Sequence, residues 1–218
     1  MQTDFELILM ERRCQAFEGA GALCTCRFEE DRGCVPSLNH AARYVQNWDR
    51  MKKKGLGLLL WGPPGTGKTF AAACIANAFI ESKDPFAPTV IMTTFGIILR
   101  RVLACTPQER EDYLNRLLGC GLLILDDFGM ERQTEFAREQ VFNLVNGRYL
   151  AGKPMVITTN LTLQEMKKPR TMDEHRIFDR VLEVCVPVCF DGESLRKEKA
   201  SENLRFYREL LGENAGCA

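Results

Sequence analysis

Short apolar runs alternate with longer stretches of helical periodicity along most of the chain. Apolar runs that suit strands lie at residues 56–61, 89–93, 122–125, 155–159 and 184–189. The residues between these runs, such as 70–80, have the spacing of helices. Strands that alternate with helices pair in parallel, and a parallel sheet is covered on both faces. The pattern therefore predicts an α/β fold, with a five-stranded parallel sheet covered by helices on both faces.

Two helical stretches indicate which faces pack. After the third strand, apolar residues recur on one helix face, whereas the charged residues fall mostly elsewhere. The apolar residues are Val141, Leu144, Val145 and Tyr149, and the charged residues are Arg138, Glu139 and Arg148. Gly152 and Pro154 end this helix. Before the first strand, a helix over residues 38–53 is predicted to pack one face against the main domain.

The composition favours a soluble protein that is not exported, and so a cytoplasmic location. The 218 residues are 45% hydrophobic, which is enough for a packed core. No apolar stretch approaches the ~20 residues that a membrane span needs, and Asp4 and Glu6 stand where a secretory signal carries basic residues. Because the net charge is zero, any contact with nucleic acid has to come from local basic patches.

The ten cysteines are scattered through predicted strands and helices, which favours reduced thiols over a disulfide scaffold. One group offers enough ligands for a zinc ion: Cys14, Cys24, Cys26 and Cys34, with His40 nearby. Structural zinc sites use paired cysteines two to four residues apart, whereas a single residue separates Cys24 from Cys26. A zinc site is therefore kept only as the alternative.

Residues 62–69 match the phosphate-binding pattern GxxxxGK[ST] and lie between an expected strand and an expected helix. Glycines let consecutive N–H groups face an anion, and the helix that follows adds the positive end of its dipole. Lys68 is expected to reach the outer phosphates of ATP or GTP, and Thr69 to bind the Mg²⁺ ion. The alternative is a glycine-rich turn that matches by accident. The complete motif is Gly62, Pro63, Pro64, Gly65, Thr66, Gly67, Lys68 and Thr69.

Polar residues follow the third and fourth strands, at the edge of the sheet where open α/β folds bind ligands. Asp126 is expected to hold Mg²⁺, and Asp127 to orient and polarise the attacking water. Asn160 is a further candidate for holding that water. The alternative for the two aspartates is an acidic turn capped by Gly129.

Three arginines late in the chain are candidates for stabilising charge on the transferred phosphoryl group. Arg176 and Arg180 lie at i and i+4 on one face of a predicted helix, from which they can reach the site of a neighbouring subunit. Arg196 is near the start of the last helix and is expected to face the nucleotide from a lid. Solvated arginines without a role in catalysis are the alternative.

In this order the motifs resemble those of the AAA+ ATPases, and in detail the DnaC-type helicase loaders and the IstB-type transposition helpers. The resemblance covers about residues 26–205. The matching parts are residues 62–69 (Walker A), 122–129 (Walker B), Asn160 (sensor 1), 176–180 (the arginine-finger segment, with Arg176 the closer match and Arg180 the second) and 192–196 (sensor 2, with Arg196).

The resemblance implies a P-loop NTPase (AAA+) fold and an ATP-hydrolysing helicase loader of DNA replication, in a phage or mobile element, with ATP and Mg²⁺ as cofactors. Subunits are expected to associate side by side, so that Arg176 of one completes the ATP site of the next. Residues 1–50 would be a short lead-in with one packed helix, and residues 51–218 the ATPase domain with a reduced lid helix. Two departures stand out. Asp127 replaces the usual Glu, which implies slow hydrolysis. Loaders carry a separate helicase-binding domain before the first strand, whereas only about fifty residues precede that strand here.

Single-stranded DNA and a replicative helicase are the partners that the resemblance implies. Candidate DNA contacts are Thr94, Phe95, Arg100 and Arg101, because aromatic stacking and phosphate neutralisation hold single strands. Equally, Phe95 can belong to the core and the arginines to a solvated face. Three rival functions remain: an ATPase helper of a DNA transposase, a non-hydrolysing adaptor switched by ATP, and a small-molecule phosphotransferase with an acceptor pocket.

Overall fold

Five parallel strands form the central sheet of the computed structural model, which describes residues 2–19, 21–31, 35, 37–129 and 134–211. Each strand coincides with one of the apolar runs, because a strand covered on both faces has few polar positions. The predicted five-stranded parallel sheet is confirmed. In spatial order the strands are β2 (Val90–Thr94), β3 (Leu122–Phe128), β4 (Met155–Thr159), β1 (Gly57–Trp61) and β5 (Cys185–Cys189).

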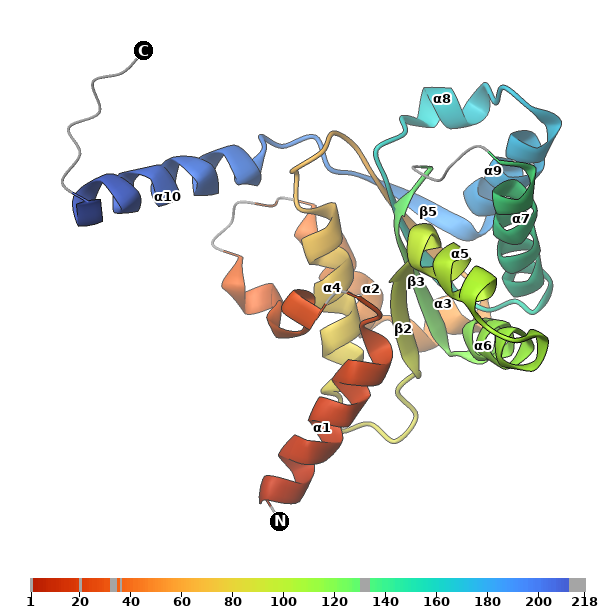
Figure 1. Ribbon diagram of the computed structural model, residues 1–218, viewed down its shortest axis with the longest axis horizontal. Helices are drawn as coiled ribbons and strands as arrows, with labels where there is room; N and C mark the ends of the chain where they lie inside the picture. Colours follow the sequence, from red (N-terminus) through yellow and green to blue (C-terminus); the bar gives the residue numbers. More distant parts are fainter. Residues whose placement is uncertain (1, 20, 32–34, 36, 130–133, 212–218) are drawn as a thin grey trace.

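Helices cover both faces of this sheet (Figure 1). One face carries α1, α2 and α4, and the other carries α5, α6, α7 and α9. The last helix, α10, extends away from the sheet. The helices are α1 (Gln2–Ala16), η1 (Gly21–Thr25), η2 (Phe28–Glu30), α2 (Leu38–Gln46), α3 (Trp48–Lys53), α4 (Lys68–Ile80), α5 (Phe95–Ala104), α6 (Pro107–Gly119), α7 (Glu135–Leu150), α8 (Leu163–Lys167), α9 (Met172–Val184) and α10 (Leu195–Leu211).

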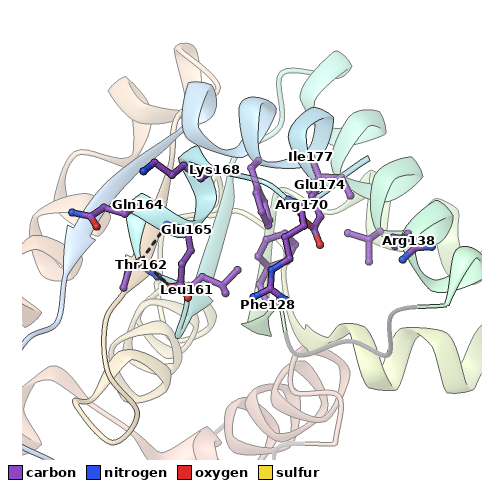
Figure 2. Close-up of a pocket in the computed structure, with 13 residues that line it drawn as sticks. Phe128, Arg138, Leu161, Thr162, Gln164, Glu165, Lys168, Arg170, Glu174 and Ile177 are labelled. Carbon is purple, nitrogen blue, oxygen red and sulfur yellow. Dashed lines mark hydrogen bonds between the residues drawn. The ribbon is translucent and has the colours of Figure 1, made fainter. Parts of the chain in front are cut away.

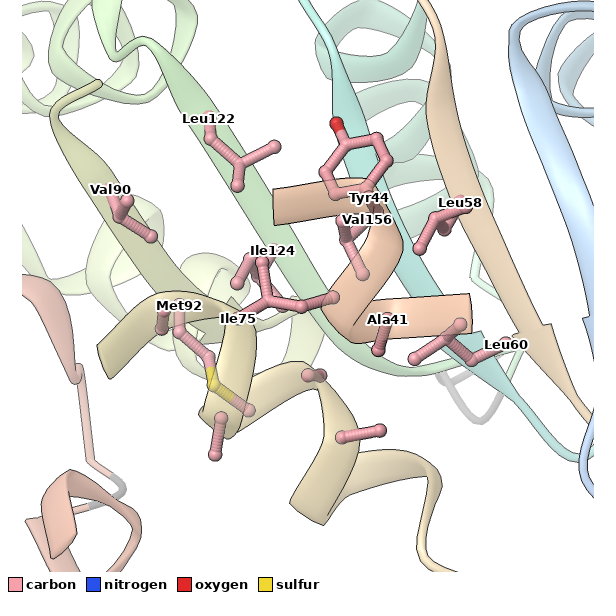
Figure 3. Packing of buried hydrophobic residues seen from close by; sticks show 14 of the residues in the cluster. Ala41, Tyr44, Leu58, Leu60, Ile75, Val90, Met92, Leu122, Ile124 and Val156 are labelled. Carbon is pink, nitrogen blue, oxygen red and sulfur yellow. The ribbon is translucent and has the colours of Figure 1, made fainter. Parts of the chain in front are cut away.

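Helices α2 and α4 pack directly on the sheet. Figure 3 shows Ala41 and Tyr44 of α2 beside Leu58 and Leu60 of β1, with Ile75 of α4 next to them. Helix α4 is rich in alanine and its alanines between residues 71 and 76 are fully buried, so that the helix lies close to the strands. This packing fixes the start of α4, which is also the end of the phosphate-binding motif.

The N-terminal segment is tied to the domain at two places. Phe17 bridges Met92 of β2 in parallel, and the buried Glu18 donates its backbone N–H to the carbonyl of Met92 at 3.0 Å. The Glu18 carboxylate accepts a hydrogen bond from Tyr113 at 2.7 Å and pairs with Arg101 and Arg116. At the second place, Arg13 and Arg27 both pair with Glu81, which directly follows α4.

The single helix predicted over residues 38–53 is wrong, because two helices occupy that range. Asn47 ends α2 and begins α3 with a backbone φ of −105° and ψ of 22°. Its side chain donates to the carbonyl of Arg43 at 2.9 Å, and this bond competes with continued helix. The apolar spacing continues across the break, which is why the periodicity did not reveal it.

The prediction that Arg148 lies away from the packed face of its helix is also wrong. Arg148 is 0% exposed and donates to the carbonyls of Leu117 and Cys120 at 2.9 Å and of Pro154 at 2.6 Å. Helix α7 packs on the sheet with one side and on α6 with another. The side that packs on α6 buries Arg148, which is not part of the main apolar face.

Two absences hold for the part of the chain that the structure describes. No helix there is long and apolar enough to cross a membrane. No group of three or more His, Cys, Asp or Glu side chains there can hold a metal ion. Cys34, one member of the alternative zinc group, lies outside the described residues.

Candidate functional site

The phosphate-binding motif forms the turn between β1 and α4. Its three glycines, Gly62, Gly65 and Gly67, all have positive φ, of 140°, 87° and 94°. At Gly62 a Cβ atom would lie only 2.2 Å from the carbonyl oxygen of Phe190, so no larger residue fits there without a shift of the backbone. The turn therefore delivers the N-terminus of α4 to the carboxyl edge of the sheet, where it can bind an anion.

Lys68, the first residue of α4, points its ammonium group back into the turn. Its Nζ donates to the carbonyls of Gly62 and Pro63, each at 2.7 Å, and the residue is 5% exposed. Burial lowers the pKa of the Lys68 ammonium, the charges of Asp127 and Asp126 oppose this shift, and Arg196 adds to it. The ammonium is thus partly desolvated and has no ion pair among the described residues. A bound phosphate would supply the missing negative charge.

Asp126 faces two hydroxyl groups at the end of β3. Its Oδ1 accepts hydrogen bonds from Thr69 at 2.9 Å and from Thr158 at 2.6 Å. Burial raises the pKa of the Asp126 carboxyl, and the two hydroxyls oppose the shift. A buried carboxylate beside the Thr69 hydroxyl is a set of hard oxygen donors, which is what Mg²⁺ prefers. Both residues thus fit the metal site that the sequence indicates.

Thr158 is a member of this site that the sequence analysis missed. It is fully buried in β4, and its hydroxyl oxygen also accepts the backbone N–H of Asp127 at 3.0 Å. Thr158 therefore fixes both aspartates at once. Asp127 itself is exposed and has a φ of 55°, a left-handed conformation that is uncommon outside glycine. The only signal in the sequence was a pair of threonines at the end of an apolar strand.

Asn160 directly follows β4 at the same edge of the sheet. The hydroxyl of Thr159 donates to the carbonyl of Phe128 at 2.7 Å, and its oxygen accepts the N–H of Leu161 at 3.1 Å. These bonds hold the turn that carries Asn160 next to the end of β3, which carries Asp127. The Asn160 side chain makes no hydrogen bond to another described residue, so its amide is free to bind a water molecule.

Arg196 and the phosphate-binding motif come together in the structure. Helix α10 begins where the N–H of Leu195 donates to the carbonyl of Gly65 at 3.0 Å. Arg196 is exposed in the first turn of this helix, and its charge lowers the pKa of the Lys68 ammonium. The start of α10, which carries the predicted lid arginine, is thus attached to the phosphate-binding motif.

The two arginines of α9 differ in their surroundings. Arg180 donates through Nε to Asn146 at 2.8 Å and through a terminal nitrogen to the carbonyl of Arg176 at 2.8 Å, and it lies over the rings of Phe142 and Tyr149. Arg176 is exposed, and its side chain makes no contact of this kind with the described residues. Arg180 is therefore held against α7, whereas Arg176 is available to a neighbouring molecule.

The structure corrects the candidate DNA contacts after β2. Phe95 is buried against the ring of Phe128, so its proposed stacking on a base is wrong and its alternative as a core residue is confirmed. The Thr94 hydroxyl caps α5 by accepting the N–H of Ile97 at 3.2 Å. Arg101 pairs with Glu18 at 3.4 Å and lies over the ring of Tyr113. Arg100 alone of the four remains exposed without a protein partner among the described residues.

A cavity of about 550 Å³ lies beyond the end of β3, between α7, α8 and α9 (Figure 2). Its apolar part includes Phe128, Leu161 and Ile177, and Lys168 and Arg170 also line it. No residue of the phosphate-binding motif lines it. It therefore lacks the position that the acceptor pocket of a phosphotransferase would need, beside the phosphates.

Comparisons with known proteins identify a family and several relatives of the chain. The family model described as IstB-like ATP binding protein matches residues 45–203. The chain is 29% identical over 176 residues to the replicative helicase loader DnaI of Bacillus subtilis. This match covers 76% of the chain and 55% of DnaI. The chain is 27% identical over 158 residues to the phage-like element PBSX protein XkdC of the same organism, and this match covers 65% of the chain and 53% of XkdC. It thus spans just over half the length of these two relatives.

The fold also matches solved structures. The crystal structure of the DnaC helicase loader superimposes with a TM-score of 0.65 at 23% identity, covering 79% of this chain and 100% of that chain. At that identity the likeness shows the fold alone. The family match covers most of the chain and includes every motif of the site. The chain belongs to the family of IstB-like ATP-binding proteins.

Proposed function

We propose that this chain is an ATP-hydrolysing helicase loader of DNA replication, encoded by a phage or mobile element. The observation that carries the proposal is the pair of buried charges at one edge of the sheet. Among the described residues, Lys68 has two carbonyls and no carboxylate as direct partners, and Asp126 has two hydroxyls and no cation. ATP with Mg²⁺ would supply both missing charges, since Lys68 would bind its phosphates and Thr69 and Asp126 would hold its metal.

Hydrolysis is assigned to Asp127 and Asn160. When bound, Mg²⁺ would neutralise charge on the phosphates. The exposed Asp127 carboxylate would polarise the attacking water, and the free Asn160 amide would orient it. Thr158 holds the left-handed backbone of Asp127, whose shorter side chain stands at the sequence position where most AAA+ proteins have glutamate.

The complete site is proposed to form between two copies of the chain. Arg176 is exposed on a rigid helix and free of protein partners among the described residues, as an arginine acting in trans has to be. Arg180 supports α9 from α7 and is assigned a positioning role. Arg196 would bind the same nucleotide in cis. ATP would thus join neighbouring subunits into an oligomer that grips single-stranded DNA and a helicase.

Calorimetry tests nucleotide binding directly. Mg²⁺-ATP titrated into the wild-type chain is expected to release or absorb measurable heat with saturation, and Lys68→Ala is expected to abolish this signal. Arg100→Ala, which changes an exposed arginine away from the site, serves as the matched control. Absence of saturable heat in the folded wild type would overturn the proposal.

Turnover measured against protein concentration tests the composite site. Specific ATPase activity is expected to rise as subunits meet, and further when single-stranded DNA is added. Arg176→Ala should remove this rise, whereas Arg12→Ala, which changes an exposed arginine of α1, should keep it. Undetectable turnover in the wild type, Asp127→Asn and Arg176→Ala, with nucleotide still bound, would favour the non-hydrolysing adaptor.

A second candidate function is an ATPase helper of a DNA transposase, which the match to the IstB-like family model favours. The loader is preferred because DnaI, a relative over 76% of the chain, is a replicative helicase loader. Pull-downs with a purified replicative helicase and with a purified transposase, each with and without ATP, separate the two. ATP-dependent capture of the transposase alone would replace the loader proposal.

A further inference from the structure

A second concave site lies on the side of the domain formed by α2, α3 and strands β1 and β5. It is a groove of about 370 Å³ that none of the nucleotide-site residues line. The floor is formed by aliphatic side chains, and the rim by basic ones. The floor residues are Met51, Leu56, Leu58, Val186 and Val188, and the rim residues are His40, Arg43, Arg50 and Lys54.

The rim has one sign of charge. Arg43, Arg50 and Lys54 are exposed, and within the described residues no hydrogen bond or ion pair engages their charged groups. No Asp or Glu of the described segments lines the groove. Lys52 and Lys53 follow on the same short helix, and Asp49 is the single acidic residue of α2 and α3. In a chain of zero net charge, this is a local positive field that attracts an acidic partner.

The floor offers apolar surface to that partner. Val186 is 42% exposed, although it lies in a strand of the sheet. Tyr44, the aromatic residue that lines the groove, is buried, and its hydroxyl donates to the carbonyl of Leu56 at 3.2 Å. Its ring is therefore not presented for stacking on a nucleic-acid base, whereas the exposed valine suits an aliphatic side chain.

The groove and the nucleotide site lie at opposite edges of the sheet. Lys54 and Leu56 precede β1, and Val186 pairs with Leu58 near the start of that strand. The phosphate-binding motif follows Trp61, at the other end of β1. An occupant of the groove would thus leave the nucleotide site open, and both ligands can bind at once.

We propose that this groove binds an acidic amphipathic segment of a protein partner. Aliphatic side chains of the segment would cover Val186 and the floor, and its carboxylates would pair with Arg43, Arg50 and Lys54. Both parts of the groove are then used, whereas the phosphates of a nucleic acid would use only the rim. This interaction surface goes beyond the proposed function, because it does not depend on ATP or on the composite site.

The test uses the full chain and a fluorescein-labelled helical peptide of about 18 residues, with leucine along one face and glutamate beside it. Fluorescence anisotropy is expected to show saturable binding that weakens as salt is raised, because the charges on the rim are exposed. The double variant Arg43→Glu/Arg50→Glu should weaken binding at least ~10-fold, since attraction becomes repulsion. Val186→Asp should weaken it as well, by replacing the apolar floor with a like charge.

Matched controls separate the groove from general surface charge. Arg100→Glu and Leu150→Asp make the same kinds of change at exposed positions outside the groove and should leave peptide binding unchanged. A peptide with lysine in place of glutamate, and one with serine in place of leucine, should bind at least ~10-fold more weakly. Thermal unfolding and Mg²⁺-ATP binding of each variant should match the wild type.

Two results would overturn the proposal. One is absence of saturable peptide binding to the folded wild type. The other is binding of a labelled oligothymidine that is lost in Arg43→Glu/Arg50→Glu and kept in Val186→Asp, which would assign the rim to nucleic acid. Neither result bears on the ATP site, which calorimetry tests separately.

Discussion

Arg148 and Lys68 are both buried cations held by backbone carbonyls, at opposite edges of the same sheet. Arg148 lies at the amino edge, where its guanidinium meets the carbonyls of Leu117, Cys120 and Pro154. Lys68 lies at the carboxyl edge, where its ammonium meets only those of Gly62 and Pro63. Within the described part of the chain, neither has a carboxylate in direct contact.

The difference lies in how completely the chain itself surrounds each charge. The carbonyls around Arg148 come from α6, from the residue that caps its C-terminus and from the turn before β4, so the cation joins the end of α6 to the turn before β4. Lys68 bonds only to its own turn, and its remaining donor capacity faces the nucleotide site. We infer that the first cation stabilises the fold, whereas the second is held ready for a ligand. Four substitutions, at the two cations and at two residues beside Lys68, test this difference.

Replacing Arg148 should have the largest effect, and on stability alone. Arg148→Met leaves several buried carbonyls without a donor and is expected to cost about 3–5 kcal/mol of the free energy of unfolding. Urea denaturation measures this cost, and Arg100→Met, an exposed change, should stay within about 0.5 kcal/mol of wild type. Mg²⁺-ATP affinity of the folded variant should be unchanged. A stable variant with lost affinity would reverse the roles of the two cations.

Replacing Lys68 should do the opposite. Lys68→Met is expected to lower Mg²⁺-ATP affinity about 100-fold, which is roughly 2.7 kcal/mol, while the nucleotide-free protein keeps or gains stability. The gain follows because the native state lowers the pKa of the ammonium, so the native state binds fewer protons than the unfolded chain.

The pH dependence of that gain supplies its own check. The cost of the charged Lys68 is fully present below its lowered pKa and disappears as pH rises toward the ordinary value of 10.5. The stability advantage of Lys68→Met over wild type should therefore shrink between neutral and alkaline pH. An advantage that grows with pH would contradict the burial of an uncompensated charge.

Removing the hydroxyl that links the two aspartates should have a smaller effect on both properties. Thr158→Val leaves the Asp127 N–H and the Asp126 carboxylate each without one partner, and is expected to cost about 1–2 kcal/mol of stability. ATP turnover should fall more than nucleotide affinity, because Asp127 loses its position. Thr158→Ser keeps the hydroxyl and should restore turnover; if it does not, the methyl group and not the hydrogen bonds explains the loss.

Asp126→Asn should give the smallest change, and in the stabilising direction. Burial raises the pKa of this carboxyl, so its ionised form costs stability at pH values above the raised pKa, and the cost vanishes as pH falls below 3.8. The nucleotide-free variant is expected to gain up to about 1 kcal/mol at neutral pH, or about 2–4 °C in melting temperature. Dependence of binding on Mg²⁺ should be lost. A lower melting temperature at neutral pH would show that the two threonine hydroxyls compensate the charge fully.

The sheet and the phosphate-binding turn could be predicted because each follows from residues that are near in sequence. Strands buried on both faces leave continuous apolar runs, and the turn needs glycine at fixed positions. Thr158 was missed because its two bonds exist only when β3 and β4 lie side by side. Arg148 was misplaced because periodicity records hydrophobic faces, whereas a guanidinium is buried where other segments present carbonyls to it.

The N-terminal segment has a consequence for work with shortened versions of the chain. Glu18 is the carboxylate that neutralises Arg101 and Arg116 beside the Tyr113 ring. Removing the residues up to and including Glu18 would leave two half-exposed arginines beside an aromatic ring without their carboxylate, a combination that binds polyanions. Such a fragment would retain heparin or oligonucleotides through charges that Glu18 neutralises in the longer chain, and its affinity would say nothing about the natural ligand.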